Sequence, residues 1–280
     1  MSIKLAVIGG SGIYKLDGLK QLGQKDVETP FGKPSSPVMH MEVGGAEFYF
    51  LPRHGVGHHI TPSELNYRAN LFALKARGVN TVVSISAVGS LQEQYSPRHF
   101  VLPDQFIDWT KGLRKRSFFD EGMVGHVSVA NPVEASLQTR IYESSLRAGI
   151  PTHLGGSYVC IEGPQFSTRA ESQIYRSFGA SIIGMTNVPE AFLAKEAGMA
   201  YATVAMVTDY DCWKEEHCTV QEIMAVMKSN YESAQKLIVD LIPSLVKSPI
   251  TFKPENQYAV MTDQSKLTAR HREIMEVVLK

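Results

Sequence analysis

The segment YATVAMVTDYD (Tyr201–Asp211) combines a nearly continuous apolar run with an abrupt acidic end. Apolar runs of this kind are typical of strands that are covered on both faces of a sheet. The run ends in Asp209 and Asp211, and two side chains at positions i and i+2 of an extended segment point to the same side. The segment therefore predicts a buried strand that delivers two carboxylates to one edge of a sheet.

Similar apolar and β-branched runs recur along the chain, each bounded by Gly, Pro or polar residues. They are KLAVIGG, EFYFLPRHG, TVVSISAVG, FVLPDQFID, SYVCIEG and SIIGMTNVP. Helical patterns lie between them, and alternating strands and helices indicate an α/β fold. We expect a twisted, mixed and largely parallel sheet flanked by helices in a single domain.

Five helix starts are predicted by a cap residue followed three positions later by Glu. The predicted caps are Thr61, Asn131, Thr168, Asn187 and Thr219. The last of these is expected to open a helix that ends near Leu241, and a final helix is expected over about 267–279. Two prolines, Pro249 and Pro254, mark a linker, so we expect residues 1–248 to form the main domain. Residues 249–280 would then be a C-terminal extension that packs on this domain or on a neighbouring subunit.

The composition excludes several classes of partner. The chain has 280 residues, 44% of them hydrophobic and 20% charged, with a formal net charge of zero. No overall charge favours nucleic acid or an anionic membrane. The basic run KGLRKR (residues 111–116) is expected to be a solvated loop, and the alternative is a local attraction for an anionic substrate.

The cysteine content and the N-terminus indicate a cytoplasmic protein. Three cysteines are too few for a disulfide framework, and Cys212, His217 and Cys218 lack the further ligands of a zinc site. The chain enters a strand at once, without the pattern of a signal peptide, and no apolar run reaches the ~20 residues of a membrane helix.

Small and polar residues follow the predicted strands, where ligands bind in α/β sheets. Gly9, Gly10, Ser11 and Gly12 could bring backbone N–H groups and a hydroxyl to an anion. The alternative of a dinucleotide site is disfavoured, because Lys15 stands where the third glycine of that fingerprint belongs. A plain strand-to-helix turn is also compatible with these glycines.

Four further strand ends carry candidate binding groups. Arg53 and His54 suit phosphate or carboxylate, whereas Ser86 and Ala87 allow close backbone approach or simply close packing. At other strand ends Thr186 could donate to phosphate, Met185 could pack on a sugar, and Phe166 could stack on a planar base. Core packing is the alternative for Met185 and Phe166.

The acid pair has two interpretations. If Asp209 and Asp211 both face a closed site, their mutual repulsion raises the pKa of at least one of them and provides a proton donor near neutral pH. Alternatively they are solvated acids in a turn.

Seven motifs in order resemble the 5′-methylthioadenosine phosphorylases, which are members of the trimeric purine nucleoside phosphorylase family. They are TPFGKPS, RHG, NYRANLFALK, DQFID, EGPQFSTRAES, MTNVPEAFLAKEAG and TDYDCWKEE, and the likeness extends from VIGGSGIY to about Asp240. The resemblance implies a nucleoside phosphorylase-like fold with its catalytic domain in residues 1–248. It also implies phosphorolysis of an N-glycosidic bond with inorganic phosphate as co-substrate and no metal or organic cofactor.

The resemblance implies a role for each matching position. Phosphate would bind at Ser11, Arg53, His54, Ser86, Ala87 and Thr186. The nucleoside would contact Met185, Phe166, Ser167, Asp209, Asp211, Val220, Ile223 and Met224. His126 and part of the C-terminal segment would reach a neighbouring subunit's site in a homotrimer or hexamer. The two acids would be catalytic, with Asp209 at purine N7 and Asp211 at the exocyclic amine.

Departures from the family pattern and rival functions limit these assignments. The loop after Trp213 is about two residues shorter than in the animal enzymes, and SAV stands where TAC is common, which favours a backbone role for Ser86. The rivals are a purine nucleoside phosphorylase for 6-oxopurines, a hydrolase that uses water, a dinucleotide-binding protein and a non-catalytic nucleoside-binding protein. The acid pair argues against the first, and Arg53 with the glycine loop argues against the second.

Overall fold

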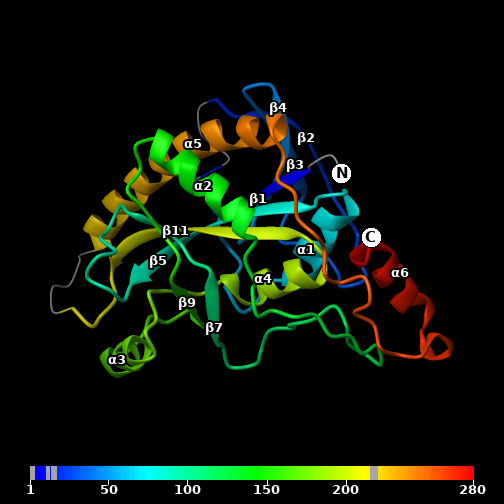
Figure 1. Cartoon of the computed structure of the whole chain (residues 1–280). Coiled ribbons are helices and arrows are strands. Elements are labelled where there is room, and N and C mark those ends of the chain that lie inside the picture. The colour runs from blue at the N-terminus through cyan, green and yellow to red at the C-terminus, as the bar shows by residue number, and fades with distance from the viewer. Residues whose placement is uncertain (1–3, 11–12, 14–17, 215–219) are drawn as a thin grey trace.

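The computed structural model describes residues 4–10, 13, 18–214 and 220–280. The described strands form one 11-stranded sheet with helices on both faces (Figure 1). The strands are β1 (Leu5–Gly9), β2 (Lys20–Lys25), β3 (Val38–Val43), β4 (Ala46–Pro52), β5 (Thr81–Ser90), β6 (Phe100–Leu102), β7 (Gln105–Trp109), β8 (Thr152–Leu154), β9 (Ser157–Ile161), β10 (Ile182–Gly184) and β11 (Ala200–Tyr210). The helices are α1 (Tyr67–Ala76), α2 (Ala135–Arg147), α3 (Arg169–Ser177), α4 (Asn187–Glu196), α5 (Val220–Lys247) and α6 (Ala269–Val278), with a 3₁₀ turn η1 (Gln264–Lys266).

The sheet is mixed and largely parallel, as the sequence predicts. Its main order is β2-β3-β4-β1-β5-β10-β9-β7, and β11 also pairs with β5 and leads on to β6 and β8. The pairs β1–β4, β1–β5, β5–β11, β9–β10, β7–β9 and β6–β8 are parallel. Strand β5 is central because it borders β1, β10 and β11.

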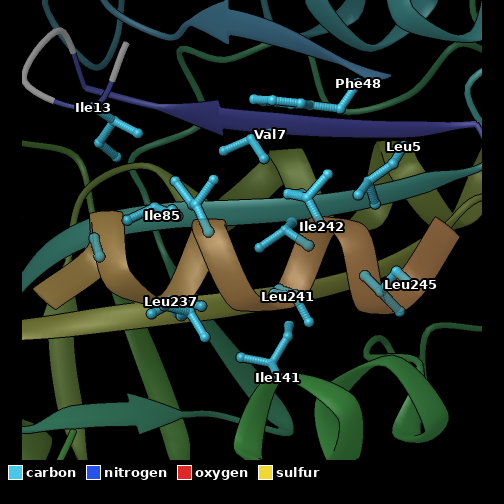
Figure 2. Close-up of a cluster of buried hydrophobic side chains, with 14 of the residues drawn as sticks. Leu5, Val7, Ile13, Phe48, Ile85, Ile141, Leu237, Leu241, Ile242 and Leu245 are labelled. Atoms are coloured by element: carbon cyan, nitrogen blue, oxygen red, sulfur yellow. The ribbon is translucent and has the colours of Figure 1, made fainter. Parts of the chain in front are cut away.

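Two apolar layers cover the sheet because alternate side chains of each strand face opposite ways. On one face, α2 and α5 pack over Leu5 and Val7 of β1 and over Ile85 of β5 (Figure 2). On the other face, α1 and α4 cover Ala6 and Ile8, and α6 packs against α1. Burial on both faces explains the nearly continuous apolar strand sequences.

Of the five predicted helix caps, one is confirmed, three are wrong and one lies outside the described residues. Thr168 caps α3 in a full capping box with Glu171, and α2 begins after Glu134, which is its own cap in place of Asn131. Helix α1 begins after Asn66, because Thr61 and Glu64 hydrogen-bond only to each other in a turn. The fourth cap, Asn187, already lies within α4, and its side chain bonds elsewhere.

The last predicted cap, Thr219, lies outside the described residues. Helix α5 ends at Lys247 rather than near Leu241 and accommodates Pro243 in its interior. The final helix, α6, agrees with its predicted range to within two residues.

The C-terminal extension packs on its own chain. Leu267, Ile274 and Val278 join the apolar layer under α1 and α4. Asn256 donates to the carbonyl oxygens of Glu196 and Val278, so it joins α4 to the end of α6. The extension therefore completes one face of the main core.

Candidate functional site

Adjacent strands place the predicted site residues at one edge of the sheet. Gly9 at the end of β1 lies beside Pro52 of β4, and the Arg53 N–H donates to the Gly9 carbonyl (2.9 Å). On β5, Ala87 lies opposite Met206 of β11. The glycine turn, the Arg53 loop, β5 and the acidic end of β11 therefore meet at the carboxyl ends of parallel strands.

A β-bulge at Thr208 sets the direction of the first acid. The register of β11 against β5 shifts between Val207 and Asp209, and bulges of this kind re-aim side chains near functional sites. The Thr208 hydroxyl donates to the Asp209 carboxylate. Beyond the strand, the Asp211 N–H donates to the Ser90 carbonyl (2.9 Å), which fixes the second acid against β5.

The acid pair is withdrawn from solvent. Burial raises the pKa of Asp209, the charge of Asp211 raises it further, and the hydrogen bond from Thr208 acts against both. Burial also raises the pKa of Asp211, which is only 8% exposed. One carboxylate oxygen of Asp211, Oδ2, is buried without a hydrogen-bond partner among the described residues. Both pKa values are raised, but burial rather than mutual repulsion is the main cause, and repulsion from Asp211 contributes only at Asp209. The solvated-turn alternative is wrong, because Asp211 is buried and Asp209 is half-buried.

The loop before α3 lies against the acidic segment. Cys212 Sγ donates to the Ser167 carbonyl (3.3 Å), and the Ser167 hydroxyl is buried without a partner among the described residues. Ser172 of α3 presents a second buried, unpaired hydroxyl and lowers the pKa of Asp211. Phe166 is 84% exposed, so the core-packing alternative for this residue is wrong. Unpaired polar atoms and a free aromatic ring are groups that a polar planar ligand can satisfy.

Arg53 is held by a buried carboxylate rather than free in the loop. Its Nε and Nη2 donate to the two carboxylate oxygens of Glu190 (2.7 and 2.9 Å). Nη1 donates to the Ile85 carbonyl (3.0 Å), and Nη2 also donates to the Ser84 hydroxyl (2.6 Å). A guanidinium has five N–H groups, so one Nη1 proton has no recorded acceptor among the described residues.

Glu190 and Asn187 form a buried polar network that the sequence analysis did not recognise. Both were read as helix-capping residues of the NVPE motif. Glu190 accepts from Arg53 and from the Tyr201 hydroxyl (2.9 Å), and Asn187 donates to Tyr201 and Thr203 of β11. The NVPE motif carries no signal of these partners, which lie on other elements of the fold.

His54 is held as a neutral imidazole beside Arg53. Its Nδ1 donates to the Ile60 carbonyl (2.8 Å), so in the neutral ring Nε2 keeps a lone pair. The ring stacks on His58 with centroids 4.4 Å apart. Burial and the charge of Arg53 lower the pKa of His54 from 6.5 to about 4.

The lowered pKa of His54 makes stability depend on pH. Between pH 6.5 and about 4 the unfolded chain binds a proton that the folded chain does not, so the free energy of unfolding falls as the pH falls. We expect the wild type to lose about 2 kcal/mol more than His54→Gln between pH 7 and pH 5. Urea unfolding of both proteins at the two pH values measures this difference. Equal losses in the two proteins would contradict the lowered pKa.

Ser86 and Ala87 of β5 lie close to Thr186 at the start of α4, because Ser86 bonds to the next residue, Asn187. Ala87 is exposed, whereas Ser86 is buried and donates to Asn187 Oδ1 (3.2 Å). Thr186 is the N-cap residue of α4 but makes no side-chain capping bond, so its buried hydroxyl is available to a ligand. Met185, half-buried, precedes it and crosses over Gly163 of the loop that leads to Phe166.

The basic run contains a buried structural arginine, so its interpretation as a wholly solvated loop is wrong. Arg114 is 5% exposed and donates to the Glu162 carboxylate (3.0 Å). Its Nη1 donates to the Met185 and Val188 carbonyl oxygens (2.7 Å each). Arg114 thereby joins the end of β9 to the start of α4 directly behind the candidate site. Sequence alone gave no signal that separates it from its exposed neighbours.

The remaining predicted residues lie apart from this cluster or outside the described chain. Ser11 and the side chain of Val220 lie outside the residues that the structure describes. On α5, Ile223 is half-buried and Met224 is 65% exposed. His126 is exposed, and its N–H donates to the Ala259 carbonyl (2.9 Å) of the C-terminal extension.

The described residues contain no group of three or more His, Cys, Asp or Glu side chains that could hold a metal ion. Over the same residues, no helix is long and apolar enough to cross a membrane.

The sequence profile of the Phosphorylase superfamily matches residues 4–243. The chain belongs to this superfamily. It is 44% identical over 278 residues to the S-methyl-5′-thioadenosine phosphorylase of Geobacter sulfurreducens, covering 98% of this chain and 97% of the relative. It is also 50% identical over 243 residues to the S-methyl-5′-thioadenosine phosphorylase of Thermofilum pendens, covering 87% of this chain and 92% of the relative.

Solved structures of superfamily members share the whole fold. A methylthioadenosine phosphorylase from an antarctic soil metagenomic library is 41% identical, with a TM-score of 0.93 and coverage of 100% of this chain and 99% of that one. The methylthioadenosine phosphorylase of Schistosoma mansoni, solved in complex with adenine, is 34% identical, with a TM-score of 0.83 and coverage of 99% and 98%. The predicted fold class and family are therefore confirmed, and the dinucleotide-binding alternative is wrong.

Proposed function

We propose that the protein catalyses phosphorolysis of S-methyl-5′-thioadenosine to adenine and 5-methylthioribose 1-phosphate. The observation that carries this proposal is that the two acids of the β11 segment and candidate phosphate ligands of β5 lie at the same edge of the sheet. Asp209 near the end of β11 lies opposite Gly89 of β5, and Asp211 just beyond β11 donates its N–H to the Ser90 carbonyl. Ser86 and Ala87 lie a few residues earlier on β5. The similarity to phosphorylases of this substrate over nearly the whole chain supports it.

Phosphate would bind on the β1, β4 and β5 side. The proposed ligands are Ser11, Arg53, His54, Ser86, Ala87 and Thr186. Glu190, Ser84 and Ile85 together accept from four of the five N–H groups of the Arg53 guanidinium, so Arg53 would contribute its remaining Nη1 proton and a fixed orientation rather than a bidentate contact. Thr186 would add a hydroxyl at the start of α4, where N–H groups favour an anion.

The nucleoside would bind between the phosphate and the two acids. Met185 would lie against the ribose, and Phe166 and Ser167 would border the purine. Asp209 would approach N7, and Asp211 would accept from the exocyclic amine with its unpaired Oδ2. Val220, Ile223 and Met224 would line the 5′ end, where an apolar surface suits a methylthio group better than a hydroxyl.

The reaction would form a bond between a phosphate oxygen and C1′ while the bond from C1′ to N9 breaks. Its transition state would have oxocarbenium character, by analogy with other glycosyl transfers, and the adjacent phosphate would stabilise that charge. Binding also orients the attack. Adenine leaves more readily once N7 is protonated, and the raised pKa of Asp209 supports its role as the proton donor. This chemistry needs no metal or organic cofactor, and phosphate is the co-substrate.

The acid pair would also select the purine. A carboxylate accepts from the 6-amino group of adenine but repels the oxygen of a 6-oxopurine. Buried polar partners of this kind discriminate by ~10⁴ or more. The alternative function, a purine nucleoside phosphorylase of broader or 6-oxopurine specificity, is disfavoured for this reason.

We also propose that the protein is a homo-oligomer, a trimer or hexamer with sites at subunit interfaces. His126 would reach the site of the next subunit. It lies on a segment that pairs with the C-terminal extension through Gly125 and Val260. Large apolar side chains beside it are exposed, namely Val124 (51%), Tyr258 (83%) and Met261 (69%), as expected of a surface that another subunit covers.

A comparison of substrates tests the proposed specificity. With saturating phosphate, kcat/KM for S-methyl-5′-thioadenosine should exceed that for inosine by ~10⁴. Adenosine, which differs only at the 5′ group, should be disfavoured far less. Faster cleavage of inosine than of S-methyl-5′-thioadenosine would contradict the assignment of the acid pair.

A further inference from the structure

Tyr158 of β9 carries a polar group that the site described so far does not use. Its side chain is fully buried (0% exposed), and its hydroxyl has no hydrogen-bond partner among the described residues. Leaving a buried hydroxyl unpaired costs stability, so a group of this kind in a native core calls for an explanation. A partner that arrives only with a ligand is one such explanation.

The tyrosine hydroxyl points toward the start of α4. Strand β9 pairs with β10 so that Tyr158 lies opposite Ile182 and Cys160 lies opposite Gly184. The ring reaches along the sheet over Gly184, where an added Cβ would lie 2.0 Å from the Tyr158 oxygen. Glycine at position 184 therefore makes the room that the hydroxyl occupies, two residues before Thr186.

Ser86 and Thr186 flank this hydroxyl. Strands β10 and β5 are antiparallel with Ile183 opposite Gly89, and Ser86 donates to Asn187, so Ser86 lies beside the start of α4 near the Tyr158 hydroxyl. In agreement with this placement, burial raises the pKa of Tyr158, whereas the Thr186 backbone N–H and the Ser86 side chain act in the opposite direction. The phenol keeps its proton near neutral pH and can only be a neutral donor or acceptor there.

Ser86 has a free acceptor for that proton. In the described structure the Ser86 hydroxyl donates to Asn187 Oδ1 over a long 3.2 Å contact, so its lone pairs remain available. A hydroxyl that donates to an anion becomes a better acceptor for a second donor, since bonds in a chain polarise one another. The phenol lies where it could be that second donor.

We propose that Tyr158 is a positioning residue of the phosphate site, whose hydroxyl donates to Ser86 when Ser86 donates to bound phosphate. This inference rests on the proposed function, because it takes Ser86 and Thr186 as phosphate ligands. It assigns Ser86 a side-chain role in addition to its backbone one. It also gives a use to a buried tyrosine hydroxyl that has no hydrogen-bond partner among the described residues.

Tyr158→Phe tests the proposal because it removes one oxygen and keeps the ring. We expect KM for phosphate to rise about 10-fold, the effect of one lost hydrogen bond, with kcat and the nucleoside KM changed by less than about twofold. The rise in Tm that inorganic phosphate produces should shrink in parallel. The Tm without phosphate should not fall, because the variant no longer buries an unpaired hydroxyl.

The matched control is Tyr142→Phe, which removes a phenolic oxygen from α2, a helix with no residue in the proposed site. It should leave KM for phosphate unchanged. An unchanged phosphate KM in Tyr158→Phe, with a phosphate-induced rise in Tm equal to that of the wild type, would overturn the proposal and leave Tyr158 a packing residue.

A double-mutant cycle tests the route through Ser86. Ser86→Ala combined with Tyr158→Phe should have the phosphate KM of Ser86→Ala alone, because the phenol acts through the serine. If the double variant raises the phosphate KM by the product of the two separate effects, the phenol does not act through Ser86. If the wild type shows neither phosphate-dependent turnover nor a phosphate-induced rise in Tm, the proposed function itself fails. If the wild type shows both responses and Tyr158→Phe has the same phosphate KM and the same phosphate-induced rise in Tm, only the role of Tyr158 is overturned.

Discussion

Asp209→Asn is expected to lower turnover of S-methyl-5′-thioadenosine by at least ~10²-fold, the scale of general-acid catalysis. Asparagine has the size of aspartate, but its amide cannot transfer a proton to purine N7. The aspartate is suited to this role because burial and the neighbouring charge of Asp211 raise its pKa. Substrate binding should suffer less than kcat, since the proton moves only as the glycosidic bond breaks.

The measurement is kcat at saturating phosphate and nucleoside, compared with a matched substitution. Asp240→Asn makes the same chemical change on the outer surface of α5, where Asp240 pairs with Arg147, and should leave kcat unaltered. Asp211→Asn distinguishes the roles of the two acids, because it should mainly reduce the preference for substrates with a 6-amino group and change kcat less. Near-normal kcat in Asp209→Asn would exclude the proton-donor role.

Glu190→Ala is expected to lower the free energy of unfolding by about 3–5 kcal/mol, the cost of stranding a buried charge. Arg53 and Glu190 have side chains that are 2% and 1% exposed. Burial lowers the pKa of Arg53 and the Glu190 charge raises it in the wild type. Without Glu190 the guanidinium would still keep its proton, because its ordinary pKa lies far above neutral pH, so the buried charge would remain. Removal of Glu190 would also leave the hydroxyls of Ser84 and Tyr201 without this acceptor.

Urea unfolding at pH 7 measures this loss, with Asp240→Asn as the control for an exposed pair. The Arg147–Asp240 pair has side chains that are 49% and 35% exposed, and such pairs contribute about 0.2–1 kcal/mol. If Glu190→Ala lowers the free energy of unfolding by no more than this control does, the Arg53–Glu190 pair does not stabilise the phosphate side of the site.

The strands and their meeting point could be predicted because their signal is local. Burial on both faces imposes an apolar run on each strand, and parallel strands place their carboxyl ends at one edge. The position of Asp209 and Asp211 beside the last residues of β5, a few positions after Ser86 and Ala87, follows from those two facts. The likeness to a known family added the roles of the individual residues.

Helix starts were less predictable because a cap residue can have a stronger partner elsewhere. In NVPE, Glu190 pairs with Arg53, which lies 137 positions earlier in the chain, and Asn187 turns to β11. In TPSE, Thr61 and Glu64 form their bond in a turn, and Asn66 caps the helix. A sequence window contains the capping residues but not these distant partners.

Buried polar groups were missed for the same reason. Arg114 lies in a run that looks solvated, yet its guanidinium fills a gap between β9 and α4 and donates to four backbone carbonyl oxygens. Tyr158 looks like any apolar strand residue, and only the space over Gly184 distinguishes it. Such roles depend on the packing of segments that are remote in sequence.

The central claim is phosphorolysis, and product analysis with S-methyl-5′-thioadenosine tests it most directly. Purified protein is incubated with the nucleoside with and without inorganic phosphate, and the products are identified by chromatography and ³¹P NMR. We expect adenine and 5-methylthioribose 1-phosphate in equal amounts, and no cleavage of the nucleoside when phosphate is omitted. Release of adenine with free 5-methylthioribose at the same rate without phosphate would show that water is the nucleophile and would contradict the account.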